Sequence, residues 1–147
     1  MNALVLEYER DFHSWIYKNI DLLKQGRLVD IDIEILIDEL ESMAKRDKRE
    51  LMSHFMILIA HLLKWEFQPS QRSSSWRGSI REQRIKIDEQ LEESPSLNNQ
   101  LAMSIEKAYP KSLSLAIEET GLSSKIFPKE CPYTIEQLLD KKFYPKS

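Results

Sequence analysis

Apolar residues recur at intervals of three and four along most of the chain, and no stretch alternates strictly between apolar and polar residues. This period is typical of α-helices with one buried side, whereas alternation would predict strands. The first such stretch runs from about Tyr8 to Lys24, and Gly26 follows it as a C-cap. We therefore predict a first helix whose apolar side holds Tyr8, Phe12, Trp15, Ile16, Leu22 and Leu23.

The same period continues over a much longer stretch that begins after Asp32, a good N-cap residue. The apolar positions keep one helical phase from Ile33 to Trp65. An unbroken helix over this range would be about 50 Å long at a rise of about 1.5 Å per residue. That length is unusual for a domain of this size, so we expect a break or bend within Ser42 to Asp47.

A loop rich in serine is predicted over residues 68–75, because proline and a serine cluster favour turns. Ser74 or Ser75 is placed to cap the next helix. Its apolar side can hold Trp76 and Ile80, and it should end before Pro95, since the residue before a proline disfavours helix.

Ser96 is placed to cap a further helix that Gly121 ends, and Thr134 to Gln137 has the spacing of a capping box for a short last helix. These elements predict an all-α fold, a mainly antiparallel bundle of four to five principal helices with a short C-terminal helix. The core is expected to include Phe12, Trp15, Leu36, Leu40, Phe55, Leu58, Leu62, Ile80, Ile87, Leu101 and Ile117.

Composition adds limits without naming a function. The chain has 147 residues with a net charge of -3, which suits a single domain over 1–147 and no overall attraction to nucleic acid or anionic lipid. Cys131 is the only cysteine, as expected in a reducing compartment. The sequence has neither the pattern of a signal peptide nor an apolar run of membrane-spanning length. We expect a soluble cytoplasmic protein that does not bind membranes.

Several short blocks occur in a characteristic order along the chain. They are Glu39-Leu-Glu-Ser42, His61-Leu-Leu-Lys-Trp-Glu-Phe-Gln-Pro69, Arg72, Ser75-Trp76, Gln83-Arg84, Ser94-Pro-Ser-Leu97, Glu119-Thr-Gly-Leu122, Phe127-Pro128 and Cys131-Pro-Tyr133. In these blocks the chain resembles the domain of unknown function twenty-nine family over nearly its whole length. The resemblance implies an all-α bundle from a bacterium, most often a cyanobacterium, and it implies no activity. The chain departs from the family pattern at Ala44, where glycine is usual, and at Pro110.

Acidic and histidine residues offer one candidate for chemistry. Glu34, Asp38 and Glu41 share a helix side, and His54 and His61 share another. The acidic side lies away from the apolar face, which favours a solvated surface. The two histidines are two turns apart, whereas metal ligands on one helix are usually three or four residues apart. We therefore interpret both sets as structural and assign no metal ligand.

The segment 64–84 is the strongest candidate for binding, because it gathers positive charge and aromatic rings in an acidic chain. Arginines can fork onto phosphate or carboxylate, and tryptophan can stack on a base or a guanidinium. The candidate residues for binding an anion or a partner are Gln68, Arg72, Trp76, Arg77, Arg81 and Arg84. The alternative is structural: Arg77 and Arg84 would pair with carboxylates of the acidic helix, for example Glu39 or Glu41, and fix the packing of the bundle.

Three functional classes remain open at this point. The first is a binding or protein-interaction module without catalytic activity, whose ligand is an unknown protein or a small anion. The second is an accessory protein that binds nucleic acid through segment 64–84. The third is a metal-assisted enzyme that uses Asp38 and Glu41 with His54 or His61. We predict no cofactor and identify no catalytic residue, and the oligomeric state is not predicted.

Overall fold

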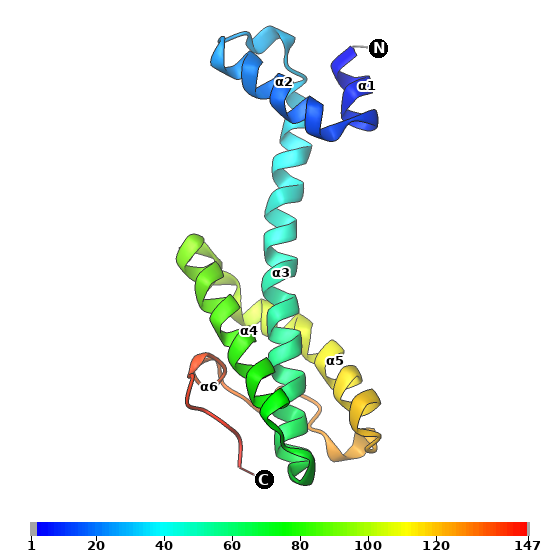
Figure 1. Ribbon diagram of the computed structural model, residues 1–147, viewed down its shortest axis with the longest axis vertical. Coiled ribbons are helices and arrows are strands. Elements are labelled where there is room, and N and C mark those ends of the chain that lie inside the picture. Colours follow the sequence, from blue (N-terminus) through cyan, green and yellow to red (C-terminus); the bar gives the residue numbers. More distant parts are fainter. Residues whose placement is uncertain (1–2, 147) are drawn as a thin grey trace. The chain divides into compact units, whose positions relative to one another are not determined.

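The computed structural model describes residues 3–146, and every regular element in that range is helical (Figure 1). The α-helices are α1 (Ala3–Arg10), α2 (Phe12–Lys24), α3 (Ile33–Phe67), α4 (Ser74–Glu93), α5 (Leu101–Thr120) and α6 (Ile135–Leu139). Short 3-10 helices occupy Leu28–Asp30, Pro69–Gln71, Pro95–Gln100 and Ser124–Ile126. The prediction of an all-α bundle with four to five principal helices and a short C-terminal helix is confirmed.

The chain divides into two units, Met1–Lys45 and Arg46–Ser147, here called unit 1 and unit 2. Unit 1 contains α1, α2 and the first turns of α3. Unit 2 contains the rest of α3 with α4, α5 and α6.

The single helix predicted from Tyr8 to Lys24 is wrong, because the chain turns at Asp11. Asp11 has an extended φ of -146°, and its side chain accepts a hydrogen bond from the amide of Ser14 at 3.1 Å. An aspartate in this position caps the helix that follows it and so ends the preceding one. The apolar period is the same before and after Asp11, so the period alone does not reveal the cap there.

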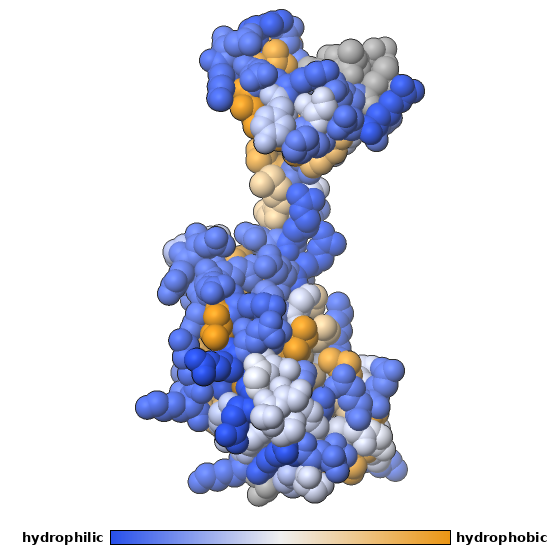
Figure 2. All heavy atoms as spheres, viewed as in Figure 1, coloured by the Kyte–Doolittle hydropathy of each residue, from blue (hydrophilic) through white to orange (hydrophobic). Residues whose placement is uncertain are grey.

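Trp15 is the centre of unit 1, with 3% of its surface exposed. The rings of Tyr8 and Phe12 lie 4.8 and 5.6 Å from it. The core prediction fails for Phe12, which is 41% exposed, and for Leu40, which is 56% exposed. Figure 2 shows apolar side chains, coloured orange, at the surface of unit 1. Two short helices and a few turns of α3 do not supply enough surface to cover every apolar side chain.

The predicted break in the long helix is also wrong, because α3 is one α-helix of 35 residues from Ile33 to Phe67. The segment Ser42 to Asp47 contains neither proline nor glycine. Alanine, methionine, lysine and arginine within it are strong helix formers, so the backbone has no reason to break.

Unit 2 is built around the second half of α3. The amide of Gln90 on α4 donates to the Asp47 carbonyl at 2.8 Å, and Gln83 meets His54 further along α3 at 2.9 Å. The partner on α4 has a lower residue number where the partner on α3 has a higher one, so α4 is antiparallel to α3. On α5, Ser112 Oγ donates to the Met56 carbonyl at 2.9 Å.

The core of unit 2 is the apolar face of α3 enclosed by α4, α5 and the C-terminal segment. Six of the predicted core residues are buried here, namely Phe55, Leu58, Leu62, Ile80, Ile87 and Leu101. Ile117 on α5 is half-buried, as is Leu36 in unit 1.

The ends of the helices follow the capping rules with two corrections. Ser73, one residue before the predicted caps, accepts from the Trp76 amide and begins α4. Ser96 does not cap α5, because a 3-10 helix over Pro95–Gln100 comes first and α5 begins at Leu101. Gly121 ends α5 at a φ of 71°, and Thr134 with Gln137 forms the predicted capping box. Between residues 3 and 146, no helix is long and apolar enough to cross a membrane.

Candidate functional site

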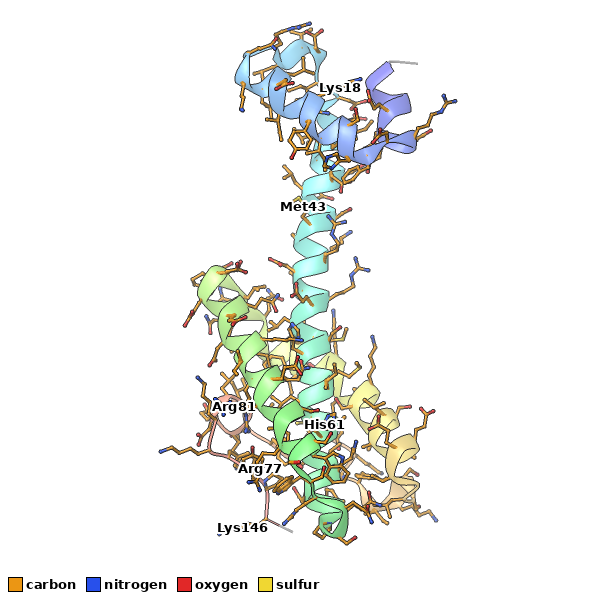
Figure 3. The ribbon with its side chains drawn as sticks, viewed as in Figure 1. Lys18, Met43, His61, Arg77, Arg81 and Lys146 are labelled. Carbon is orange, nitrogen blue, oxygen red and sulfur yellow. The ribbon has the colours of Figure 1, made fainter. Side chains whose placement is uncertain are left out.

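Three arginines of α4 and two residues of the C-terminal segment line one cavity in unit 2. Arg77, Arg81 and Arg84 are spaced by four and three residues, so they share a side of the helix. The cavity has a volume of about 320 Å³, and we call it the arginine pocket. It is lined by Arg77, Arg81, Arg84, Ile85, Lys141 and Tyr144. Figure 3 shows Arg81 and Arg77 on the side of α4 where the C-terminal segment runs.

Arg84 is the buried member of the pocket, with 2% of its surface exposed. Its Nε donates to the carbonyl of Leu138 at 2.9 Å, and its Nη2 donates to the carbonyl of Gln137 at 3.1 Å. Both acceptors lie at the end of α6, where helix carbonyls lack partners within the helix. Arg84 therefore joins α4 to the C-terminal segment.

The structural alternative for Arg84 is right about burial. Within unit 2, the described partners of its guanidinium are backbone carbonyls, and no carboxylate of this unit forms an ion pair with it. Burial lowers the pKa of Arg84 from its ordinary value, and Tyr144 and Asp140 partly oppose this. Backbone carbonyls accept hydrogen bonds from two of the three guanidinium nitrogens without neutralising the charge.

The charge of the pocket is unbalanced. Within residues 7–146, neither Arg77 nor Arg81 has a carboxylate within 4.0 Å, and Lys141 Nζ lies 3.4 Å from Asp88. The buried Nη1 of Arg84 has no hydrogen-bond partner in the described part of the chain. Buried polar atoms are nearly always paired, so this guanidinium nitrogen lacks an acceptor that the described residues could have supplied.

Aromatic rings hold Arg77 at the edge of the pocket. Its guanidinium carbon lies 5.4 Å from the Trp65 ring centre and 5.8 Å from that of Tyr144. The Trp65 and Tyr144 rings are themselves 4.8 Å apart. Cation–π contacts of this kind orient an arginine without neutralising its charge.

The other candidate residues of segment 64–84 do not line the pocket. Arg72 Nε donates to the Trp65 carbonyl at 2.8 Å. The side chain of Gln68 donates to the Thr120 carbonyl at 3.4 Å. Trp76 is half-buried beneath Lys64, whose ammonium lies 4.8 Å from its ring centre. These contacts hold the three side chains against other parts of unit 2.

Ile85, Lys141 and Tyr144 are the pocket residues that our sequence reasoning missed. Lys141 and Tyr144 lie about fifty residues beyond the end of α4, and the packing of α6 brings them back to it. The signal was present, because Lys141-Lys-Phe-Tyr144 repeats the mixture of cations and aromatic rings seen in segment 64–84.

Both candidate histidines make contacts within α3 or with α4. His54 Nδ1 lies 2.9 Å from Gln83 Oε1, and His61 Nδ1 lies 2.9 Å from the Ile57 carbonyl. Burial lowers the pKa of His61. Glu34, Asp38 and Glu41 are exposed, as the solvated interpretation predicts. The described residues contain no group of three or more histidine, cysteine or acidic side chains that would hold a metal ion.

Cys131 and Tyr133 are two further titratable groups whose pKa burial changes. Burial raises the pKa of the Cys131 thiol, which disfavours the thiolate. The Tyr133 hydroxyl donates to Glu66 Oε1 at 3.0 Å, and burial raises the pKa of Tyr133 as well.

The comparisons with known proteins give the family. A family model described as "Domain of unknown function DUF29" matches residues 7–144. The chain belongs to this family. The DUF29 match includes α4, the C-terminal segment up to Tyr144 and therefore every residue of the arginine pocket. No curated protein and no solved structure matches the chain significantly.

Proposed function

We propose that this protein is a binding module without catalytic activity and that it holds a small anion in the arginine pocket. One observation carries the proposal: Arg77, Arg81 and Arg84 line a single cavity and form no ion pair among the described residues. A cavity of about 320 Å³ is large enough for a phosphate group with part of a molecule attached.

Phosphate is the anion that this chemistry favours. Guanidinium groups bind phosphate through charge-assisted hydrogen bonds, each about twice as strong as a neutral one. Arg84 is already held by two backbone carbonyls, so little side-chain entropy is lost when an anion arrives. Arg81 and Lys141 are exposed and can close onto the ligand.

A reducing bacterial cytoplasm is the setting that we propose, since the lone thiol of Cys131 needs no oxidising compartment. A phosphorylated small molecule and an acidic or phosphorylated protein present the same group to the pocket. The nucleic-acid alternative draws on the same arginines. We rank it second because a cavity engages one phosphate group, whereas nucleic-acid binding usually tracks several. The metal-assisted enzyme ranks third, since His54 and His61 are two helical turns apart and the described residues contain no group of three or more histidine, cysteine or acidic side chains placed to hold a metal ion.

Titration of the full chain with inorganic phosphate, followed by NMR at constant ionic strength, tests the proposal. We expect saturable shifts at Arg77, Arg81 and Tyr144. Arg81→Gln should weaken binding by about 10-fold or more, since a hydrogen bond to a charged group contributes about 1.5–3 kcal/mol.

Lys86→Gln is the matched control, because it removes one positive charge from the same helix outside the pocket, where Lys86 pairs with Glu82 at 3.0 Å. It should leave the affinity unchanged. Equal weakening by both substitutions would indicate general attraction to a positive surface and would contradict a built site, as would shifts that never saturate.

A further inference from the structure

A second cavity adjoins the arginine pocket, and Tyr144 lines both. It has a volume of about 430 Å³, and we call it the aromatic pocket. Tyr133, Phe143 and Tyr144 supply its rings, with Pro132 and Pro145 beside them. In Figure 3, Lys146, which also lines it, lies near Arg77 at the same end of unit 2. Tyr144 is therefore shared by a cationic cavity and a cavity with mainly aromatic walls.

The aromatic pocket contains two polar side chains with unused hydrogen-bonding atoms. Glu66 accepts from the Tyr133 hydroxyl through Oε1, and among residues 7–146 its Oε2 makes no hydrogen bond. Gln137 accepts from the Thr134 amide through its side-chain oxygen, and no acceptor in the described chain meets its amide nitrogen. The pocket thus offers a carboxylate acceptor and an amide donor.

This combination matches a planar ring that carries an amine next to a ring nitrogen. The amine donates to a carboxylate, and the ring nitrogen accepts from an amide. Proteins that hold single bases read them in this way, by hydrogen bonds to the base edge and by stacking on aromatic side chains. Adenine presents this edge, whereas uracil has an oxygen in place of the amine.

From the two adjoining cavities we infer that the ligand is a mononucleotide with an amine-bearing base, adenine foremost. Its phosphate lies among Arg77, Arg81 and Arg84, and its base lies against Tyr144 and Phe143 beside Glu66. The inference rests on the proposed function, because the phosphate occupies the proposed anion site. It adds the chemical class of the rest of the ligand.

Calorimetric titration of the full chain with adenosine monophosphate, uridine monophosphate, adenosine and inorganic phosphate tests the inference at constant ionic strength. Base stacking is typically strong enough that adenosine monophosphate should bind at least about 10-fold more tightly than phosphate. Uridine monophosphate should bind more weakly than adenosine monophosphate by about 5-fold or more, since it lacks the amine that would donate a hydrogen bond to Glu66.

Glu66→Gln is the sharpest variant, because the amide keeps an oxygen for Tyr133 and loses the second acceptor. It should weaken the binding of adenosine monophosphate by about 5-fold or more and leave phosphate binding unchanged. Arg81→Gln should weaken the binding of both ligands. The comparison of the two nucleotides uses the unaltered chain, so it decides the matter even where a variant fails to fold.

The outcomes separate the two proposals. Phosphate binding that depends on Arg81, together with adenosine monophosphate no tighter than phosphate, overturns the nucleotide inference and supports the anion site. Equal binding of the two nucleotides also overturns the inference. Absence of binding by phosphate and by both nucleotides overturns both proposals.

Discussion

Unit 1 and unit 2 differ in how far their apolar side chains are buried. Among the described residues, the large apolar side chains that remain exposed are concentrated in unit 1, and Val29 reaches 98% exposure. In unit 2, six large apolar side chains on α3 alone are completely buried, namely Leu51, Phe55, Leu58, Ile59, Leu62 and Leu63. Amphipathic periodicity is present in both units. An extensive core forms where α3, α4, α5 and the C-terminal segment pack together, whereas unit 1 buries little beyond Trp15 and Ile31.

The same contrast governs titratable groups. Burial changes the pKa of His61, Arg84, Tyr109, Cys131 and Tyr133, all in unit 2, and raises that of Tyr109 to about 12. In unit 1, the pKa of Glu7 is lowered by hydrogen bonds from Lys18 and Ser14. Unit 2, which also contains the arginine pocket, therefore buries titratable side chains deeply enough to change their pKa.

The sharpest test of the contrast compares two leucines of the same helix. Leu58 is fully buried in unit 2, and Leu40 is 56% exposed in unit 1. Leu58→Ala should lower the free energy of unfolding by about 2–5 kcal/mol, because it removes buried methyl groups and leaves a cavity. Leu40→Ala should change it by about 0.5 kcal/mol or less.

Urea denaturation of the two variants measures both values. A cost at Leu40 equal to that at Leu58 would break the comparison, since it would mean that Leu40 is covered in solution.

A smaller effect is expected where Arg84 holds the C-terminal segment to α4. Arg84→Ala removes the donor from the carbonyls of Gln137 and Leu138, so it should lower the free energy of unfolding by about 1–3 kcal/mol. Arg81 is exposed, and Arg81→Ala should change stability by about 0.5 kcal/mol or less.

Thermal melts of the two single variants check this pair. If Arg84→Ala melts with the parent protein, the two carbonyls find other partners and Arg84 has no structural role.

The smallest effect concerns pH and the half-buried His61. Because burial lowers its pKa in the folded state, the unfolded chain binds the proton more readily. Stability is therefore lost as the pH falls from about 6.5, the ordinary histidine value, through the lowered folded value. Below that value the loss is complete.

His61→Leu removes this proton linkage. Measured by urea denaturation at pH 7.5 and 5.5, its stability should fall less with acidification than that of the parent, by about 1 kcal/mol or less. An equal fall in both proteins would show that His61 does not contribute.

The sequence predicted the positions of most helices and much of the core because those features depend on local order. Gly121 needs a positive φ, Thr134 and Gln137 cap each other, and Phe55, Leu58 and Leu62 share one helical face. Local patterns did not distinguish a continuous α3 from a broken one, nor a cap at Asp11 from a helix that continues. The strong helix formers between Ser42 and Asp47 keep α3 continuous, whereas the turn at Asp11 depends on the backbone conformation of the cap itself.

Only the tertiary structure decided which arginines belong together. Arg72 and Arg77 are near neighbours in sequence, yet one binds the Trp65 carbonyl and the other lines the arginine pocket. The pocket closes because α6 returns to α4 and presents carbonyls to Arg84, while the segment after α6 brings the ring of Tyr144 to Arg77. Helical periodicity in the sequence determined which side chains share a face of α4. Only the packing of the whole chain determined which distant segments contact that face, because such contacts do not depend on local sequence.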